Sequence, residues 1–180
     1  MSKKDEERKG AKADFNNRMD ADKSGRVEEV ATRQAATYRH KYDGLAPRLT
    51  ISIDVTALTP TGENTKRADG IWDTGATNTV INKPLADRLG IVPAPPAADE
   101  LEPMTMTETR YEGRATVRLR IGDVVTPFFH AKVSDLDPDG RKAAMGYEVP
   151  EFLIGMDVIA SGLLIVDSMG DDTVLRFTMA

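Results

Sequence analysis

Apolar and polar residues alternate over much of the chain after Pro47. Residues 49–55 and 115–121 follow the two-residue period of a strand that is buried on one face. Further runs rich in β-branched and aromatic residues lie at 127–133, 162–166 and 173–177. The pattern predicts a mostly β domain built from short strands.

One short helix is expected among these strands, at residues 83–89. Asn82 is suited to the N-cap position and Gly90 to the end of the helix. Short strands separated by turn signals, with a single helix among them, indicate a barrel or a sandwich.

The first 45 residues differ in character from the rest. They are charged and rich in alanine, and hold few large apolar residues. One weak helical stripe lies at Val27, Ala31, Ala35, Tyr38 and Tyr42. It predicts a frayed helix or a helix that docks on a neighbour. We therefore expect two parts, a helical or disordered N-terminal extension over residues 1–45 and a folded domain over residues 46–180.

Composition and charge exclude several classes of function. The chain has 180 residues, is 40% hydrophobic and contains no cysteine, which allows a real core and removes disulfides and thiolate metal sites. Residues 1–46 carry a net charge of +2 and the remainder −7, which argues against binding to nucleic acid. No apolar run has the length of a membrane span, so we expect a cytoplasmic protein with no membrane contact.

The stretch IWDTGAT, residues 71–77, places a carboxylate after two large apolar residues and before a turn-forming Thr-Gly pair. A charge at the end of an apolar strand is costly unless it is hydrogen-bonded or used chemically. Asp73 therefore either caps a turn with its own side chain or carries out a reaction. Trp72, directly before it, is expected to lie in the core.

The segment DTGATNTVI, residues 73–81, resembles the active-site motif of the retropepsin-like aspartic proteases, in particular the single-domain, non-viral members. A second segment, FLIGMDVI at residues 152–159, looks like the family's apolar-apolar-Gly element, which crosses the catalytic loop and leads into a short helix. Asp157 is expected to cap that helix. Residues 105–113 occupy the place of the flap.

The resemblance implies a retropepsin-like acid protease barrel with one or two short helices, and a reaction that needs no cofactor and no metal ion. Two aspartates share one proton, so that one activates water and the other donates to the carbonyl oxygen. With a single DTG triplet, the chain would act as a homodimer with one Asp73 per chain, on a peptide or protein substrate. Thr74 would support the loop beneath the acid, and Gly75 would allow close approach and turn dihedrals. The residues expected to contact the substrate are Ala76, Thr77, Thr105, Met106, Thr107 and Ile154.

Two departures from the retroviral pattern affect these expectations. Thr77 and Met156 stand where retroviral members carry the two partners of a buried ion pair, so other contacts must hold the dimer. Residues 105–109 contain no glycine at the tip of the flap. An alternative is therefore a catalytically weak domain that keeps the fold for dimerisation or for binding peptides.

A third possibility is calcium-dependent regulation. Residues 20–28 follow the first half of an EF-hand loop, with Gly25 at the sixth position, but Ala31 stands where a bidentate Glu is needed. Residues 135–140 show a similar pattern and are expected to form a Pro-Asp-Gly turn.

Overall fold

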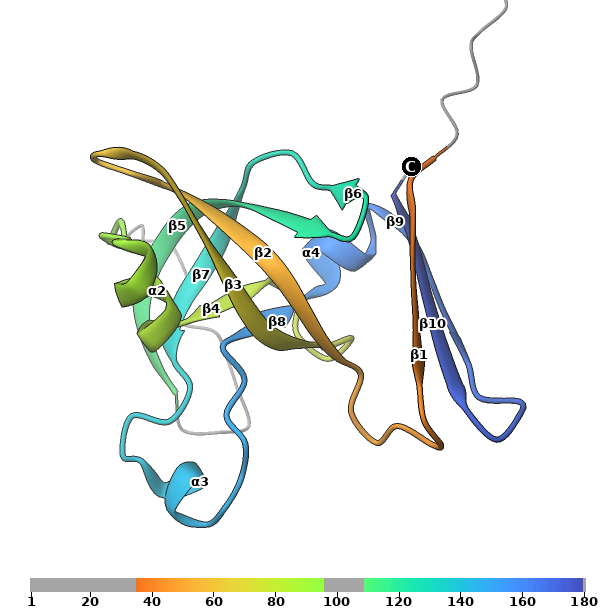
Figure 1. The fold of residues 1–180 in the computed structure, drawn as a ribbon. Coiled ribbons are helices and arrows are strands. Elements are labelled where there is room, and N and C mark those ends of the chain that lie inside the picture. Colours follow the sequence, from red (N-terminus) through yellow and green to blue (C-terminus); the bar gives the residue numbers. More distant parts are fainter. Residues whose placement is uncertain (1–34, 96–108, 180) are drawn as a thin grey trace, which may run out of the picture. The chain divides into compact units, whose positions relative to one another are not determined.

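The computed structural model describes residues 35–95 and 109–179 (Figure 1). The strands are β1 (Thr37–Tyr42), β2 (Thr50–Thr59), β3 (Gly62–Trp72), β4 (Val80–Asn82), β5 (Arg110–Ile121), β6 (Val124–Val125), β7 (Phe129–Asp135), β8 (Phe152–Ile154), β9 (Gly162–Asp167) and β10 (Thr173–Met179). The helices are α2 (Lys83–Leu89), α3 (Arg141–Ala144) and α4 (Met156–Ile159). The predicted mostly β architecture is confirmed.

Six of the strands form a closed ring. Strand β2 pairs with β3, β3 with β8, β8 with β4, β4 with β7 and β7 with β5, and the pairing of β5 with β2 closes the ring. Alternate side chains point inward, as the two-residue period predicts. Ile53, Val55, Val117 and Leu119 are all fully buried. The ring therefore encloses the main core, and β3 and β8 lie side by side in its wall.

Helix α2 covers one end of the ring and has the predicted limits. Gly90 ends it in the left-handed conformation, with φ of 70°. Asn82 holds the N-cap position, but its side chain makes no cap hydrogen bond. Its Nδ2 donates to the Pro150 carbonyl at 3.1 Å and its Oδ1 accepts the Leu136 N–H at 3.1 Å. The expected cap is thus replaced by a bridge between two loops.

A second sheet, the terminal sheet, contains β1, β10 and β9 in that order. Strand β1 lies where a helical stripe was predicted, so the helical interpretation of Tyr38 and Tyr42 is wrong. A four-residue spacing fits two strand periods as well as one helical turn, and pairing with β10 decides between them. Strand β1 thus belongs to the fold although it precedes residue 46. Val27 and Ala31 lie outside the described residues.

Trp72 and Phe177 join the terminal sheet to the ring. Their ring centroids are 5.0 Å apart in a tilted arrangement, and both side chains are buried. Trp72 is thus a core residue, as expected. Because Trp72 directly precedes Asp73, strand β10 supports the loop that carries this acid.

Candidate active site

Asp73 begins the loop that follows β3. The Trp72 N–H donates to the Leu49 carbonyl at 3.0 Å, and the Asp73 N–H donates to the Ile154 carbonyl at 2.9 Å. The end of β3 is therefore hydrogen-bonded to a neighbouring segment on each side, directly before and at the residue that carries the carboxylate. Asp73 is half-buried.

The Gly75 N–H orients the Asp73 carboxylate by donating to Oδ1 at 2.9 Å. A Cβ atom on Gly75 would lie 3.2 Å from the same oxygen, which is a tight contact. Gly75 is not among the glycines with positive φ. Glycine is thus favoured here by space next to the acid and not by the turn dihedrals that the sequence suggested.

Thr74 does not support this loop within one chain. The residue is exposed, and its hydroxyl has no hydrogen-bond partner among the described residues. Thr79, which is fully buried, is a hydroxyl residue of this motif whose side chain is bonded within the chain. Sequence reasoning did not identify Thr79, although it is a hydroxyl residue within the same motif.

The second motif lies against the first through its backbone. The Met156 N–H donates to the Ala76 carbonyl at 2.8 Å, and the Asp157 N–H donates to the Thr77 carbonyl at 3.1 Å. A Cβ atom on Gly155 would lie 2.4 Å from the carbonyl carbon of Asn78, so no other residue fits without moving the backbone. The two motifs therefore form one unit.

Asp157 completes this unit with its side chain. Both carboxylate oxygens accept the Thr79 N–H at 2.9 Å, and Oδ1 also accepts the Thr79 hydroxyl at 2.7 Å. The Val158 N–H donates to the same Oδ1 at 2.9 Å. Gly155 holds the N-cap position of α4, no side chain makes a cap hydrogen bond there, and Asp157 lies in the first turn, so the predicted cap by Asp157 is wrong. The main contact of Asp157 is with the loop that carries Asp73.

The predicted substrate-binding residues have different environments. Ala76 and Thr77 lie on the loop that follows Asp73, where Ala76 is half-buried and Thr77 exposed. Ile154 is fully buried, so its side chain belongs to the core and the expected substrate contact is incorrect. Thr105, Met106 and Thr107 lie outside the described residues.

Gly113, the last residue of the segment predicted to be the flap, lies in the described part of the chain. Ala94 and Arg114 form an isolated antiparallel bridge, with N–H to carbonyl distances of 2.8 and 2.9 Å. Gly113 beside it has φ of 136°, and a Cβ atom there would lie 2.1 Å from the Ala94 carbonyl oxygen. Glycine at this position allows the close approach of the segments that carry Ala94 and Arg114.

Within residues 35–95 and 109–179, no group of three or more His, Asp and Glu side chains is placed to hold a metal ion. The loop at residues 135–140 forms a turn, as expected. The carboxylate of Asp137 in this loop accepts hydrogen bonds from backbone N–H groups. The N–H groups of Lys142 and Ala143 donate to the Asp137 carboxylate, which lowers the pKa of Asp137 from its usual value. The EF-hand-like residues 20–31 lie outside the described part.

Comparison with known proteins identifies the family. A family model described as aspartyl protease matches residues 59–158, which include the first motif and all but the last residue of the second. The chain belongs to the aspartyl protease family. A search of curated proteins found no match to this family member.

In the described part of the chain, no helix has the length and apolar character needed to cross a membrane.

Two solved structures are similar to this aspartyl protease family member. The retroviral protease-like domain of Ddi1 from Leishmania major shares 16% identity, with 66% of this chain and 82% of that chain covered and a TM-score of 0.43. A retropepsin-like aspartic protease from Rickettsia conorii also shares 16% identity, with 81% and 96% covered and a TM-score of 0.45.

Proposed function

We propose that this member of the aspartyl protease family is a homodimeric endopeptidase, in which water is activated between two Asp73 residues, one from each chain. The observation that carries the proposal is the fixed, half-buried Asp73 in the only Asp-Thr-Gly triplet of the sequence. Two carboxylates are needed because one must accept a proton while the other donates one. Two-fold symmetry supplies the second.

The position of Asp73 suits this chemistry. Its Oδ1 accepts the Gly75 N–H, whereas Oδ2 accepts no hydrogen bond from the described residues. In the proposed reaction, the ionised Asp73 takes a proton from water as the water oxygen bonds to the peptide carbonyl carbon. The protonated Asp73 of the second chain donates its proton to the carbonyl oxygen. The first Asp73 then gives the proton that it took to the amide nitrogen, while the Asp73 of the second chain takes a proton back from one hydroxyl of the diol. The C–N bond breaks, and the products are a carboxylic acid and an amine.

Strand β9 supports the proposed dimer. Among the described strands β9 pairs with β10 alone, at the edge of the terminal sheet, so one side of its backbone is available for pairing with a second copy. Leu163 is 60% exposed and Ile165 is 41% exposed, on the face that carries Thr178 and Arg176 of β10. An exposed apolar edge strand is a ready surface for a second copy of the chain. Strand β9 also follows α4 closely, and α4 is bonded to the catalytic loop.

The test is cleavage of a mixed peptide library by the purified protein and by Asp73→Asn. We expect cleavage by the wild type and at least a 1000-fold loss in the variant, on the order of the losses seen when an essential catalytic group is removed. Asp123→Asn, an exposed turn acid, is the matched control and should cleave normally. Equal cleavage by the wild type and Asp73→Asn would refute the proposal. Peptide binding without cleavage in either protein would favour the catalytically weak binding module.

A further inference from the structure

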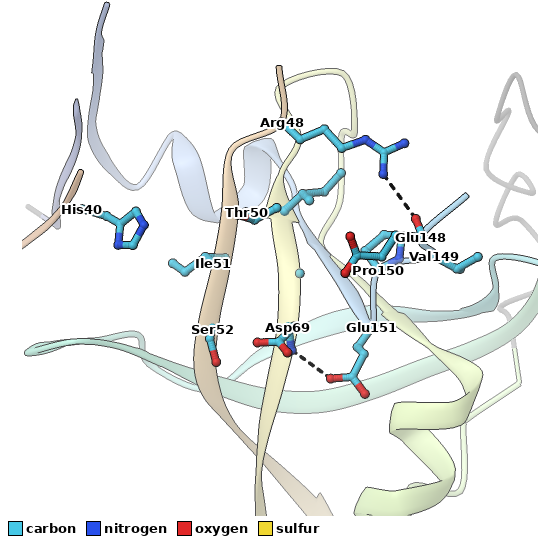
Figure 2. Close-up of a pocket in the computed structure, with 12 residues that line it drawn as sticks. His40, Arg48, Thr50, Ile51, Ser52, Asp69, Glu148, Val149, Pro150 and Glu151 are labelled. Carbon is cyan, nitrogen blue, oxygen red and sulfur yellow. Dashed lines mark hydrogen bonds between the residues drawn. The ribbon is translucent and has the colours of Figure 1, made fainter. Parts of the chain in front are cut away.

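A cavity of about 550 Å³ opens on the outer face of β2 and β3 (Figure 2). Its floor is formed by the first residues of β2 and the last residues of β3. Its walls come from His40 of β1, from Arg48 and from residues 148–151, which lead into β8. All of these lining residues lie in the described part of the chain.

The cavity and the candidate catalytic acid share one face of the chain. Asp69 and Ile71 line the cavity, and by the two-residue period of a strand they point to the same side as Asp73. The exposure agrees, because Gly70 and Trp72 between them are buried. Each two-residue step along a strand spans about 7 Å, so the backbone of Ile71 lies roughly 7 Å and that of Asp69 about 13 Å from that of Asp73.

Three carboxylates face this cavity, and one of them is already engaged. Glu151 contacts Arg88 at 2.5 Å and accepts the Asp69 N–H at 2.8 Å. Neither the Asp69 nor the Glu148 carboxylate has an ion-pair partner among the residues that the structure describes. The lining thus holds two carboxylates, those of Asp69 and Glu148, that form no ion pair within the described part of the chain.

The single guanidinium in the lining lies at the other end. Arg48 Nη1 donates to the Glu148 carbonyl at 3.3 Å, and Figure 2 shows it well away from Asp69. Arg48 therefore does not neutralise the Asp69 carboxylate. A second guanidinium, that of Arg67, lies beside the lining, where its Nε donates to Ser52 at 2.9 Å and its Nη1 contacts Asp54 at 3.4 Å. With Arg67 balanced by Asp54 and Glu151 by Arg88, the remaining charge of Asp69, Glu148 and Arg48 is negative by one if His40 is neutral.

The wall beside Asp69 is fixed before any ligand arrives. The Glu151 N–H donates to the Asp69 carbonyl at 2.8 Å, and the Asn82 N–H donates to the Glu151 carbonyl at 2.9 Å. The Asn82 side chain also donates to the Pro150 carbonyl. A ligand would thus meet a preorganised surface, which reduces the entropy lost on binding.

We propose that this cavity binds a basic side chain, lysine or arginine, of an extended peptide substrate, with the Asp69 carboxylate as its charge partner. An extended peptide rises about 3.3 Å per residue, so the side chain would lie two to four residues from the scissile bond. The position relative to that bond rests on the proposed function. The charge preference rests on the cavity alone.

The experiment measures peptide binding to full-length Asp73→Asn, so that cleavage does not interfere. Fluorescent peptides would be identical except for lysine, norleucine or glutamate at the second, third or fourth residue from the bond. At one of these positions we expect the lysine peptide to bind about fivefold tighter than the norleucine peptide, and the glutamate peptide to bind more weakly than the norleucine peptide. A fivefold difference in affinity corresponds to one partly exposed ion pair. Asp69→Asn should remove the preference, and Asp69→Lys should turn it toward glutamate.

The controls separate this proposal from the proposed function. Asp123→Asn should keep the lysine preference, and the melting temperature of each variant shows whether it is folded. A lysine preference that is absent, or that persists in folded Asp69→Asn, overturns the cavity proposal even if the wild type cleaves peptides. A preference that follows Asp69 while the wild type cleaves nothing supports the cavity and refutes the protease.

Discussion

The carboxylate of Asp157 holds Thr79 across 78 positions of the chain, with bonds to both its N–H and its hydroxyl. The Thr79 hydroxyl in turn accepts the Gly155 N–H at 3.2 Å. These contacts tie the loop that carries Asp73 to the element that crosses it. Because Thr79 is fully buried, its polar groups have no water to replace a lost partner.

Removing the Asp157 carboxylate should therefore destabilise the fold. In Asp157→Ala the buried Thr79 N–H and hydroxyl lose their acceptor, which costs about 1–3 kcal/mol. A loss of that size lowers the melting temperature by roughly 3–10 °C. Asp157→Asn keeps one acceptor oxygen and should lose less. The exposed Asp171→Ala is the control, and an Asp157→Ala protein as stable as this control would contradict the predicted role.

Charges placed on β9 should separate the proposed dimer. Lysine in place of Leu163 or Ile165 puts a cation on an exposed apolar edge, which disfavours pairing with a second copy. We expect both variants to sediment as monomers at concentrations where the wild type is dimeric, and to lose peptidase activity in parallel. Met169→Lys, at a residue that is 96% exposed in the turn after β9, should stay dimeric. A monomeric Leu163→Lys protein with full activity per chain would rule out the shared site.

Acid should weaken the contact between Glu151 and its neighbours. Burial acts to raise the pKa of Glu151, but hydrogen bonds from Arg88 and from the Asp69 N–H outweigh it, so the pKa lies below its ordinary 4.5. A lowered pKa means that this contribution to stability is present above about pH 4.5 and is lost as the pH falls through the value in the folded protein.

The measurement is the melting temperature from pH 6 to pH 3. We expect a steeper fall for the wild type than for Glu151→Gln, which has no carboxylate to protonate. Asp123→Asn serves as the control and should follow the wild type. Identical curves for the wild type and Glu151→Gln would show that this contact contributes nothing to acid stability.

The start of the folded domain can be tested by two truncations. Strand β1 pairs with β10, and Tyr38 and Tyr42 contact the core. The Tyr42 hydroxyl also donates to the Thr50 carbonyl at 2.5 Å. We propose that the domain begins near Ala35, where a compact unit starts, and not at residue 46.

A chain beginning at Ala35 should therefore melt within about 2 °C of the full protein, whereas one beginning at Leu45 should be much less stable or insoluble. Loss of a strand exposes apolar surface and leaves the edge of β10 unpaired. Equal melting temperatures for the two truncated chains would show that the domain begins near residue 46, as the sequence predicts.

The sequence by itself determined the local elements and the chemistry of the motif. Alternation predicts β2 and β5 because each has one face toward the core, and the limits of α2 follow from Gly90, which ends the helix in the left-handed conformation. The Asp-Thr-Gly triplet and the later Gly155 segment carry the family resemblance. Each of these motifs consists of consecutive residues and can therefore be recognised in the sequence. Such features need no knowledge of distant neighbours.

Tertiary structure decided what depends on residues far apart in the chain. Tyr38 and Tyr42 have a spacing that suits a helix or a strand, and only β10 selects the strand. Asn82 is a residue type that commonly caps helices, but in the folded chain its side chain is hydrogen-bonded to Pro150 and Leu136 in two loops. Thr79 contacts the Asp157 carboxylate because the pairing of β4 with β8 brings these two distant residues together. Hydrogen bonds and burial are set by where the folded chain brings such groups together, and a one-dimensional pattern does not contain that information.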